Sequence, residues 1–237
     1  TYGIGDYVSS TITAENSEQW LNLSSGSTSI NNTGVSDFTD YGNGDYGVTY
    51  TVVANDSNVD GIANLSASFR LSDTFGNLSN IFNDDDNTLA QSSTTFIIDA
   101  VRPTISEVIL PAGNYGVGSQ ITSTITSSER YLSLDYIDFN GIQTGFSSIT
   151  DLGSNSYSIV WTVPDQGTDY SKDRISTDNN VVTVSLVDIG DNVSTTFTSN
   201  ATENGAVNID ATEPVIYAIT LPSGSFGIGQ TVSATIE

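Results

Sequence analysis

The feature that most constrains the fold is an internal repeat of about 111 residues. The segment Ile98–Thr126 (IDAVRPTISEVILPAGNYGVGSQITSTIT) aligns without a gap with Ile209–Glu237 (IDATEPVIYAITLPSGSFGIGQTVSATIE). Its Asp, Pro and Gly anchors keep this spacing, as Asp99 and Asp210 illustrate. A period near 110 residues with several short strands has the size of a β-sandwich domain and exceeds that of helical solenoid repeats. We therefore expect several copies of one β-rich unit.

The opening segment, TYGIGDYVSSTIT, is a third copy of the second half of this pattern. Placing the repeat boundary at the linker aspartate divides the chain into three parts. Residues 1–99 are expected to form a repeat that lacks its first strand, residues 100–210 a complete repeat, and residues 211–237 the first two strands of a further one. Isolated hairpins are marginally stable. We expect the two-strand tail either to continue into further sequence or to be donated to a neighbouring molecule.

Alternation of side chains predicts the strands and their buried faces. Ile121, Ser123 and Ile125 share one face of a strand, and the SYSIVWTV segment places Trp161 on a face with three other apolar residues, so Trp161 and its repeat counterpart Tyr50 are expected in the core. The segments DTFGN (73–77) and DIGDN (188–192) predict hairpin turns, with Gly and Asn suited to positive φ. The inserts that follow, 80–91 and 198–206, are expected to form an extra loop or an edge hairpin.

Composition excludes several classes of function. The formal net charge is −23 with only 5 Lys and Arg, which disfavours nucleic acid and anionic membrane surfaces as partners. The absence of His and Cys removes the common general base, the common nucleophile pairs and most transition-metal sites, so we expect no enzyme. No apolar run approaches the roughly 20 residues of a membrane span, so direct membrane insertion is not expected.

The turn and linker motifs carry a family resemblance. A strand followed by D-x-x-G-N, then a strand running to V-D-x-x-x-P, resembles the bacterial immunoglobulin-like tandem repeats of large surface adhesins and related surface proteins. The matching positions are Asp73, Gly76 and Asn77 with Asp99 and Pro103, and Asp188, Gly190 and Asn192 with Asp210 and Pro214. The resemblance implies tandem immunoglobulin-like β-sandwiches in an elongated array, an extracellular cell-surface location, and linkers stiffened by Ca²⁺.

Oxygen ligands recur at the expected domain junction. The incoming linker of such a domain lies at the same end as the turn before its last strand, so Asp99 should approach Asp188, Asp191 and Asn192, and Glu129 could join them. Asp210 holds the corresponding place in the next linker. Ca²⁺ takes six to eight oxygen ligands in flexible geometry and suits such a set. The alternative is that these turn residues make only local hydrogen bonds. The run Asn83–Asn87 lacks the alternating spacing of an EF-hand loop and is expected to be solvated.

The sequence leaves three functions open. The first is a structural spacer in a long surface adhesin, in which repeated sandwiches project a distal binding domain and contact neighbouring repeats of the same chain. The second is a protomer of an extracellular filament or sheath, in which identical subunits exchange strands. The third is a carbohydrate-binding module in which Trp20, or a cluster of Tyr41, Tyr46 and Tyr50, stacks on sugar.

Overall fold

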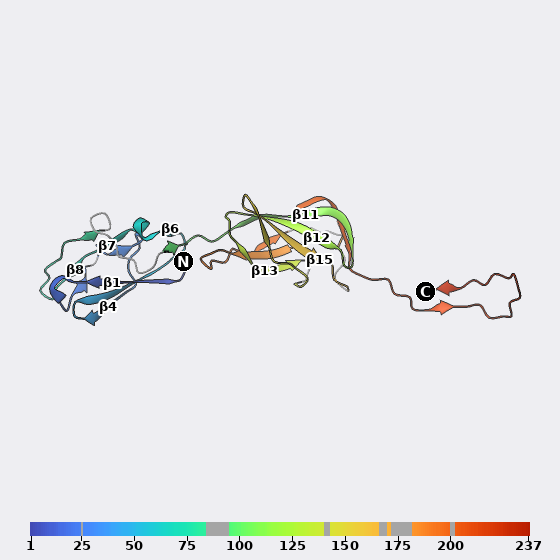
Figure 1. The fold of residues 1–237 in the computed structure, drawn as a ribbon, viewed down its shortest axis with the longest axis horizontal. Helices are drawn as coiled ribbons and strands as arrows, with labels where there is room; N and C mark the ends of the chain where they lie inside the picture. The colour runs from blue at the N-terminus through green and yellow to red at the C-terminus, as the bar shows by residue number, and fades with distance from the viewer. Residues whose placement is uncertain (25, 84–94, 140–142, 166–169, 172–181, 200–201) are drawn as a thin grey trace.

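The computed structural model describes residues 1–24, 26–83, 95–139, 143–165, 170–171, 182–199 and 202–237. Strands account for almost all regular structure in these ranges, so the all-β prediction is confirmed. We call residues 1–99 the first unit, residues 100–210 the second unit and residues 211–237 the tail. Figure 1 shows the three following one another along the long axis. In the described ranges, no helix is long and apolar enough to cross a membrane.

The first unit contains short strands and two 3-10 turns, η1 and η2. Its longest strands form a three-stranded sheet in the order β1-β5-β4, and its other pairings are β3-β7-β9, β2-β8 and β10-β6. The bounds are β1 Tyr7–Thr13, η1 Glu15–Ser17, β2 Asn22–Leu23, β3 Ser29–Ile30, β4 Asp37–Gly42, β5 Asp45–Thr51, β6 Val59–Asp60, η2 Ile62–Asn64, β7 Ala67–Phe69, β8 Leu71–Ser72, β9 Phe82–Asn83 and β10 Ile97–Ile98.

The second unit is a sandwich of two sheets. One has six strands in the order β14-β15-β12-β11-β19-β16, and the other has three in the order β13-β17-β18. The bounds are β11 Ile105–Gly116, β12 Gln120–Ser127, β13 Ser133–Phe139, β14 Thr150–Gly153, β15 Ser156–Thr162, β16 Tyr170–Ser171, β17 Val182–Val187, β18 Phe197–Ser199 and β19 Thr202–Asp210. The tail contributes β20 Ile219–Thr220 and β21 Thr235–Ile236, which pair with each other.

The long strand β11 changes partner along its length. Its first half is antiparallel to β12, from Ile105 to Ile109, and its second half is parallel to β19, from Ile109 to Gly116. Pro111 lies two residues after Ile109, the last residue that pairs with β12. Proline has no N–H to give to a ladder, which suits it to a position where a strand leaves one partner for another.

Each unit has its own hydrophobic core, and the predicted buried faces are confirmed. In the second unit, Ile121, Ile125 and Trp161 of the six-stranded sheet pack in one core with Val184 and Leu186 of the three-stranded sheet. Ser123, on the same face of β12, is also buried. In the first unit Tyr50 is fully buried against strands of the facing sheet. Alternation with a period of two residues therefore identifies the inward-facing side chains correctly.

The prediction for the inserts after the turns needs correction. In the second unit, β18 pairs with β17 whereas β19 pairs with β11, so residues 198–206 connect the two sheets and do not form an edge hairpin. In the first unit most of the insert, including four residues of the Asn83–Asn87 run, lies outside the described residues. Both predicted turns are present, but in the second turn Asp191, not Gly190, has a positive φ.

Candidate metal site at the junction of the two units

Three carboxylates converge where the linker enters the second unit. Asp99 comes from the linker, Glu129 from the loop after β12 and Asp188 from the turn after β17, and one oxygen of each lies within 4.8 Å of the others. Asp99 and Asp188 are buried and Glu129 is half-buried. The structure thus brings together three of the six residues that the sequence placed in a metal site. We call Asp99, Glu129 and Asp188 the junction cluster.

The turn that carries Asp188 is held by its own hydrogen bonds. Oδ1 of Asp188 accepts from the backbone N–H groups of Gly190 and Asn192, at 2.7 and 3.0 Å, and Oδ2 accepts from the Asn192 amide at 3.0 Å. The first unit repeats the pattern between Asp73 and Asn77, at 2.8 Å to the backbone and 2.7 Å to the side chain. At Asp73 these hydrogen bonds hold the carboxyl pKa below its ordinary value, since they favour the ionised form. The turn conformation therefore has a local cause that requires no metal.

Asn192 fastens the linker and the first unit to the second unit. Its Nδ2 donates to the Asp99 carbonyl at 2.9 Å, and its Oδ1 accepts from the Ile4 backbone N–H at 2.7 Å. Asn192 is buried. The backbone approaches closely beside it, since a Cβ on Gly3 would stand 1.6 Å from the Gly190 carbonyl oxygen. Asn192, predicted as a metal ligand, uses its oxygen to hold the first unit in place.

The linker itself is fixed on both sides of Asp99. Asn58 of the first unit donates from Nδ2 to Asp99 Oδ1 at 3.0 Å, and its Oδ1 accepts from the Ala100 N–H at 2.7 Å. Arg102, three residues after Asp99, donates from Nη1 to the Val193 carbonyl at 2.8 Å. The linker is therefore hydrogen-bonded to the first unit through Asn58 and to the second unit through Arg102. These contacts together determine where the Asp99 carboxylate lies.

Glu129 is the member of the cluster with the most perturbed ionisation. Its backbone carbonyl accepts from Tyr157 Oη at 3.1 Å and from Ser127 Oγ at 2.7 Å, which fixes the loop. Its Oε1 is buried and has no hydrogen-bond partner in the described part of the chain. Burial, followed by repulsion from Asp99 and Asp188, raises the pKa of the Glu129 carboxyl to about 7.

This ionisation gives stability a specific pH dependence. The unfolded chain loses the Glu129 proton near pH 4.5, the ordinary value for a glutamate, whereas the folded chain keeps it until about pH 7. Without divalent cations, the free energy of unfolding should therefore fall between about pH 4.5 and 7, because the folded state holds the extra proton there. We expect Glu129→Gln to lose that fall. Urea unfolding at pH 5 and pH 8 in chelator measures the change in the free energy of unfolding between these two pH values. An equal change in the variant and the parent chain would contradict the assignment to Glu129.

The remaining predicted ligands lie outside the junction cluster. Asp191 is exposed in the turn, and Asp210 lies at the opposite end of the second unit, where its Oδ1 accepts from the Thr212 N–H. Residues that sequence reasoning missed are Gly3, Ile4 and Asn58. The repeat aligns Gly3 with Gly116, so the sequence shows that a glycine recurs at this position. It does not show which atoms Gly3 contacts.

The donor set of the junction cluster fits a hard divalent cation. All three side chains offer carboxylate oxygen, and Ca²⁺ binds carboxylates in one- or two-oxygen modes. The partnerless Oε1 of Glu129 and the raised pKa both indicate a negative charge that lacks compensation among the described residues. Asp99 and Glu129 could supply ligand oxygens while Asp188 also keeps its turn closed.

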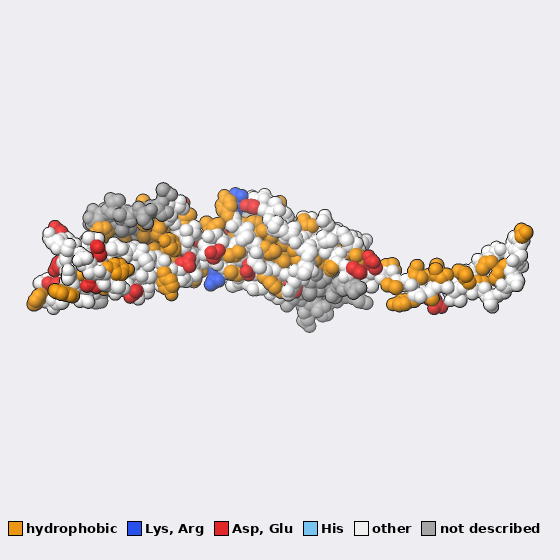
Figure 2. Space-filling view, turned by 60° about the horizontal axis from the view of Figure 1, so that its bottom comes forward, with side chains coloured by type: hydrophobic (Ala, Val, Ile, Leu, Met, Phe, Trp, Pro, Cys, Tyr) orange, Lys and Arg blue, Asp and Glu red, His pale blue; other side chains and the backbone are white. Residues whose placement is uncertain are grey.

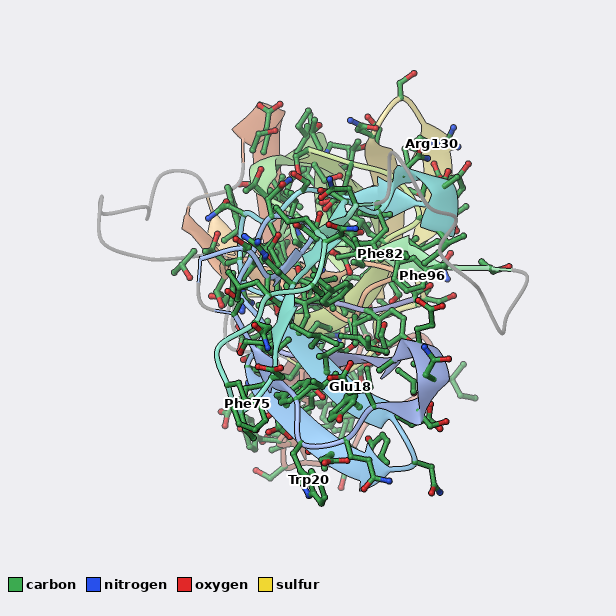
Figure 3. The ribbon with its side chains drawn as sticks, turned by 90° about the vertical axis from the view of Figure 1, so that its left-hand side faces the viewer. Glu18, Trp20, Phe75, Phe82, Phe96 and Arg130 are labelled. Atoms are coloured by element: carbon green, nitrogen blue, oxygen red, sulfur yellow. The ribbon has the colours of Figure 1, made fainter. Side chains whose placement is uncertain are left out.

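Two of the exposed aromatic side chains, Trp20 and Phe75, lie at the end of the first unit away from the linker. Figure 3 looks along the long axis onto this end, where Trp20 and Phe75 project outward, and both are largely exposed. Tyr41 is also exposed, but Tyr46 and Tyr50 are fully buried. The predicted sugar-stacking cluster of three tyrosines is therefore wrong.

Comparisons with known proteins add little to this picture. No family model matches the chain. No curated protein matches it. Solved structures similar to it include the titin domains Z1Z2 in complex with telethonin, with 10% identity, coverage of 90% of this chain and 91% of that chain, and a TM-score of 0.25. A chimeric titin Z1Z2-Z1Z2 tandem carrying a GRGDS peptide from fibronectin shares 8% identity, with coverage of 90% and 94% and a TM-score of 0.22. These scores are low, and the assignment of β-sandwich structure rests on the strand pairing of the chain itself.

Proposed function

We propose that the chain is a non-catalytic structural spacer of an extracellular surface protein, and that a Ca²⁺ ion bound by Asp99, Glu129 and Asp188 stiffens the joint between its units. One observation carries the proposal: a linker carboxylate meets two carboxylates of the following unit, and an oxygen of Glu129 is buried there without a partner. The neighbours that such a spacer contacts are repeats of the same kind.

The location of the cluster explains what a cation would do. Asp99 belongs to the linker and is hydrogen-bonded to Asn58 of the first unit, whereas Glu129 and Asp188 belong to the second unit. A cation held by all three would tie the two units together and offset the repulsion between their carboxylates. The hydrogen bonds through Asn192 would then be reinforced at the same place.

The repeated pattern supports a spacer more than a catalyst. The linker Asp is repeated as Asp210, and the turn pair Asp188 and Asn192 is repeated as Asp73 and Asn77. A site at each junction would suit a chain of similar units, because stiffness at every joint sets the length over which the chain projects. The extracellular location is part of this proposal, since millimolar Ca²⁺ would keep a weak site of this class filled.

Calcium titration tests the proposal. With Ca²⁺ at about ten times its dissociation constant, the second unit should melt roughly 5 °C higher than in chelator, because binding to the folded state alone adds about 1.4 kcal/mol. Small-angle scattering should show a longer particle with Ca²⁺. Glu129→Gln should abolish both responses, whereas Asp191→Asn, which removes a turn carboxylate outside the cluster, should keep them.

Two results would contradict the proposal. Equal melting temperatures and equal scattering profiles with Ca²⁺ and with chelator would leave the cluster as a set of structural carboxylates. A Ca²⁺ response that Glu129→Gln retains and Asp191→Asn loses would place the ion elsewhere in the turn.

A further inference from the structure

The two units hold one exposed aromatic side chain in the same loop. Trp20 and Tyr131 occupy equivalent positions of the repeat and are 72% and 70% exposed. Both have a positive φ, 57° and 62°, which costs free energy for a bulky side chain because its Cβ crowds the backbone. Since neither ring is buried, packing does not offset this cost. Glycine or asparagine would suit the backbone better, so the retained ring indicates a role other than folding.

A buried tyrosine hydroxyl fixes this loop in each unit. Tyr157 donates from Oη to the Glu129 carbonyl at 3.1 Å and accepts from the Leu132 N–H at 3.2 Å. Tyr46 makes the equivalent two hydrogen bonds in the first unit, at 2.9 and 3.2 Å. Both tyrosines are fully buried. The aromatic residue between the two bonded positions is therefore presented in the same way by both units.

In the second unit a cation lies over the aromatic ring. The guanidinium carbon of Arg130 is 5.2 Å from the centroid of the Tyr131 ring. Its Nη2 is paired with Oδ2 of Asp151 at 3.1 Å. Oδ1 of Asp151 accepts from the Gly153 N–H at 2.6 Å, which fixes the carboxylate. The ring and the carboxylate thus hold one guanidinium between them, through a cation–π contact and an ion pair.

The first unit keeps the carboxylate in the same place. Asp40 is the repeat counterpart of Asp151, and its Oδ1 accepts from the Gly42 N–H at 2.7 Å. Asp40 lies opposite Tyr46 in the β4-β5 ladder, as Asp151 lies opposite Tyr157 in the β14-β15 ladder. Since the same tyrosine fixes the aromatic loop, the carboxylate has the same placement relative to that loop in both units.

The first unit lacks the cation. The uncharged Gln19 takes the place of Arg130, and no described cation lies over the Trp20 ring. Oδ2 of Asp40, the counterpart of the oxygen that binds Arg130, has no hydrogen-bond partner among the described residues. Tryptophan makes the strongest cation–π contacts of the aromatic side chains. The first unit therefore offers a ring and a carboxylate for a cation that this loop does not supply.

Exposure and charge both favour a cation from another molecule. The first unit and the linker precede the second unit, yet Tyr131 stays 70% exposed, so a neighbouring unit does not cover this position of the repeat. The formal net charge is −23 with only 5 Lys and Arg. Figure 2 shows acidic side chains outnumbering basic ones on the face in view. Such a surface attracts cationic groups, whereas the chain has few of its own to fill the site.

We propose that Trp20 and Asp40 form a binding site for an arginine side chain of a partner protein, whose guanidinium lies over the indole and pairs with the carboxylate. Arginine suits this pair because its planar guanidinium stacks on an aromatic ring and bonds a carboxylate at the same time. The site is separate from the junction cluster. It adds a partner contact to the proposed spacer and does not depend on Ca²⁺ binding.

Nuclear magnetic resonance of the full chain tests this inference, because the chain has two Trp and the buried Trp161 serves as the reference for Trp20. In chelator, the peptide acetyl-Ala-Arg-Ala-amide should shift the Trp20 indole N–H resonance with a dissociation constant on the order of 10 mM, since an exposed cation–π contact and an exposed ion pair are each weak. The Trp161 resonance should not move. The same peptide with citrulline, which keeps the shape without the charge, should bind roughly fivefold or more weakly.

Substitution of Gln19 tests the comparison between the units. Gln19→Arg gives the first unit the guanidinium that the second unit has, so its own side chain should occupy the ring and weaken peptide binding roughly fivefold or more. Gln19→Met, a side chain of similar length without charge, is the matched control and should bind as the parent chain does. Asp40→Asn should weaken binding roughly threefold, because it removes the ion pair but keeps an acceptor for the Gly42 N–H.

Four results would overturn the proposal. The first is a Trp20 resonance that does not move up to about 50 mM peptide, well above the expected dissociation constant. The second is an equal response to the citrulline peptide, which would show that charge does not matter. The third is undiminished binding by Gln19→Arg, and the fourth is an equal loss in Gln19→Met.

Discussion

Replacing Trp161 with alanine is expected to lower the free energy of unfolding of the second unit by about 3–5 kcal/mol. Trp161 is 1% exposed, and its ring lies 4.3 Å from that of Phe139 and 6.1 Å from that of Phe146, measured between centroids. The substitution removes both ring contacts and leaves a cavity at the centre of the sandwich.

Hydrogen exchange of the β12 and β15 amides, together with denaturant unfolding, measures this loss. Trp161→Phe should cost much less, because it keeps a ring in place and removes an Nε1–H that has no hydrogen-bond partner within the described ranges. Trp20→Tyr is the surface control, since Trp20 is 72% exposed and the second unit carries Tyr131 at the matching position. A loss at Trp161→Ala no larger than that at Trp20→Tyr would contradict the packing described here.

The core was predictable because it depends on local periodicity. Alternation along β12 and β15 identified the inward-facing residues, and the repeat transferred the assignment from Trp161 to Tyr50. The path of residues 198–206 was not predictable in this way. Polar inserts carry no periodicity, so their sequence does not distinguish a hairpin within one sheet from a connection between two sheets.

The residues of the candidate site were also only partly predictable from the sequence. The approach of Asp99 to Asp188 followed from where a linker enters a sandwich, and Glu129 from the loop beside it. Asn58 and Ile4 could not be found, because their contacts depend on the relative placement of two units. Asp191 was included because it shares the turn with Asp188, and Asp210 because it repeats Asp99 in the next linker. In the structure Asp191 is exposed, and Oδ1 of Asp210 accepts from the Thr212 N–H.

Separate cores and a shared joint imply that the units can move relative to each other without unfolding. The described residues form no strand pair between the first and second units. Their relative placement therefore depends on a few side chains and on close backbone contact near Asn192. Adding one atom at this contact should therefore change the stiffness of the joint strongly. The same change should leave the stability of each unit nearly unaffected.

Gly3→Ala should open the joint while both units stay folded. A Cβ on Gly3 would lie 1.6 Å from the oxygen and 2.7 Å from the carbon of the Gly190 carbonyl, and backbone atoms cannot rotate away as a flexible side chain can. The units must separate, which breaks the Ile4 to Asn192 hydrogen bond. Fast exchange of the Ile4 amide and a broader distribution of particle lengths in solution scattering should follow, with unchanged exchange in β12 and β15. Gly116→Ala, at the equivalent repeat position with no described atom within 4 Å of its Cβ, should change none of these quantities. A protected Ile4 amide in Gly3→Ala would show that the joint does not depend on this contact.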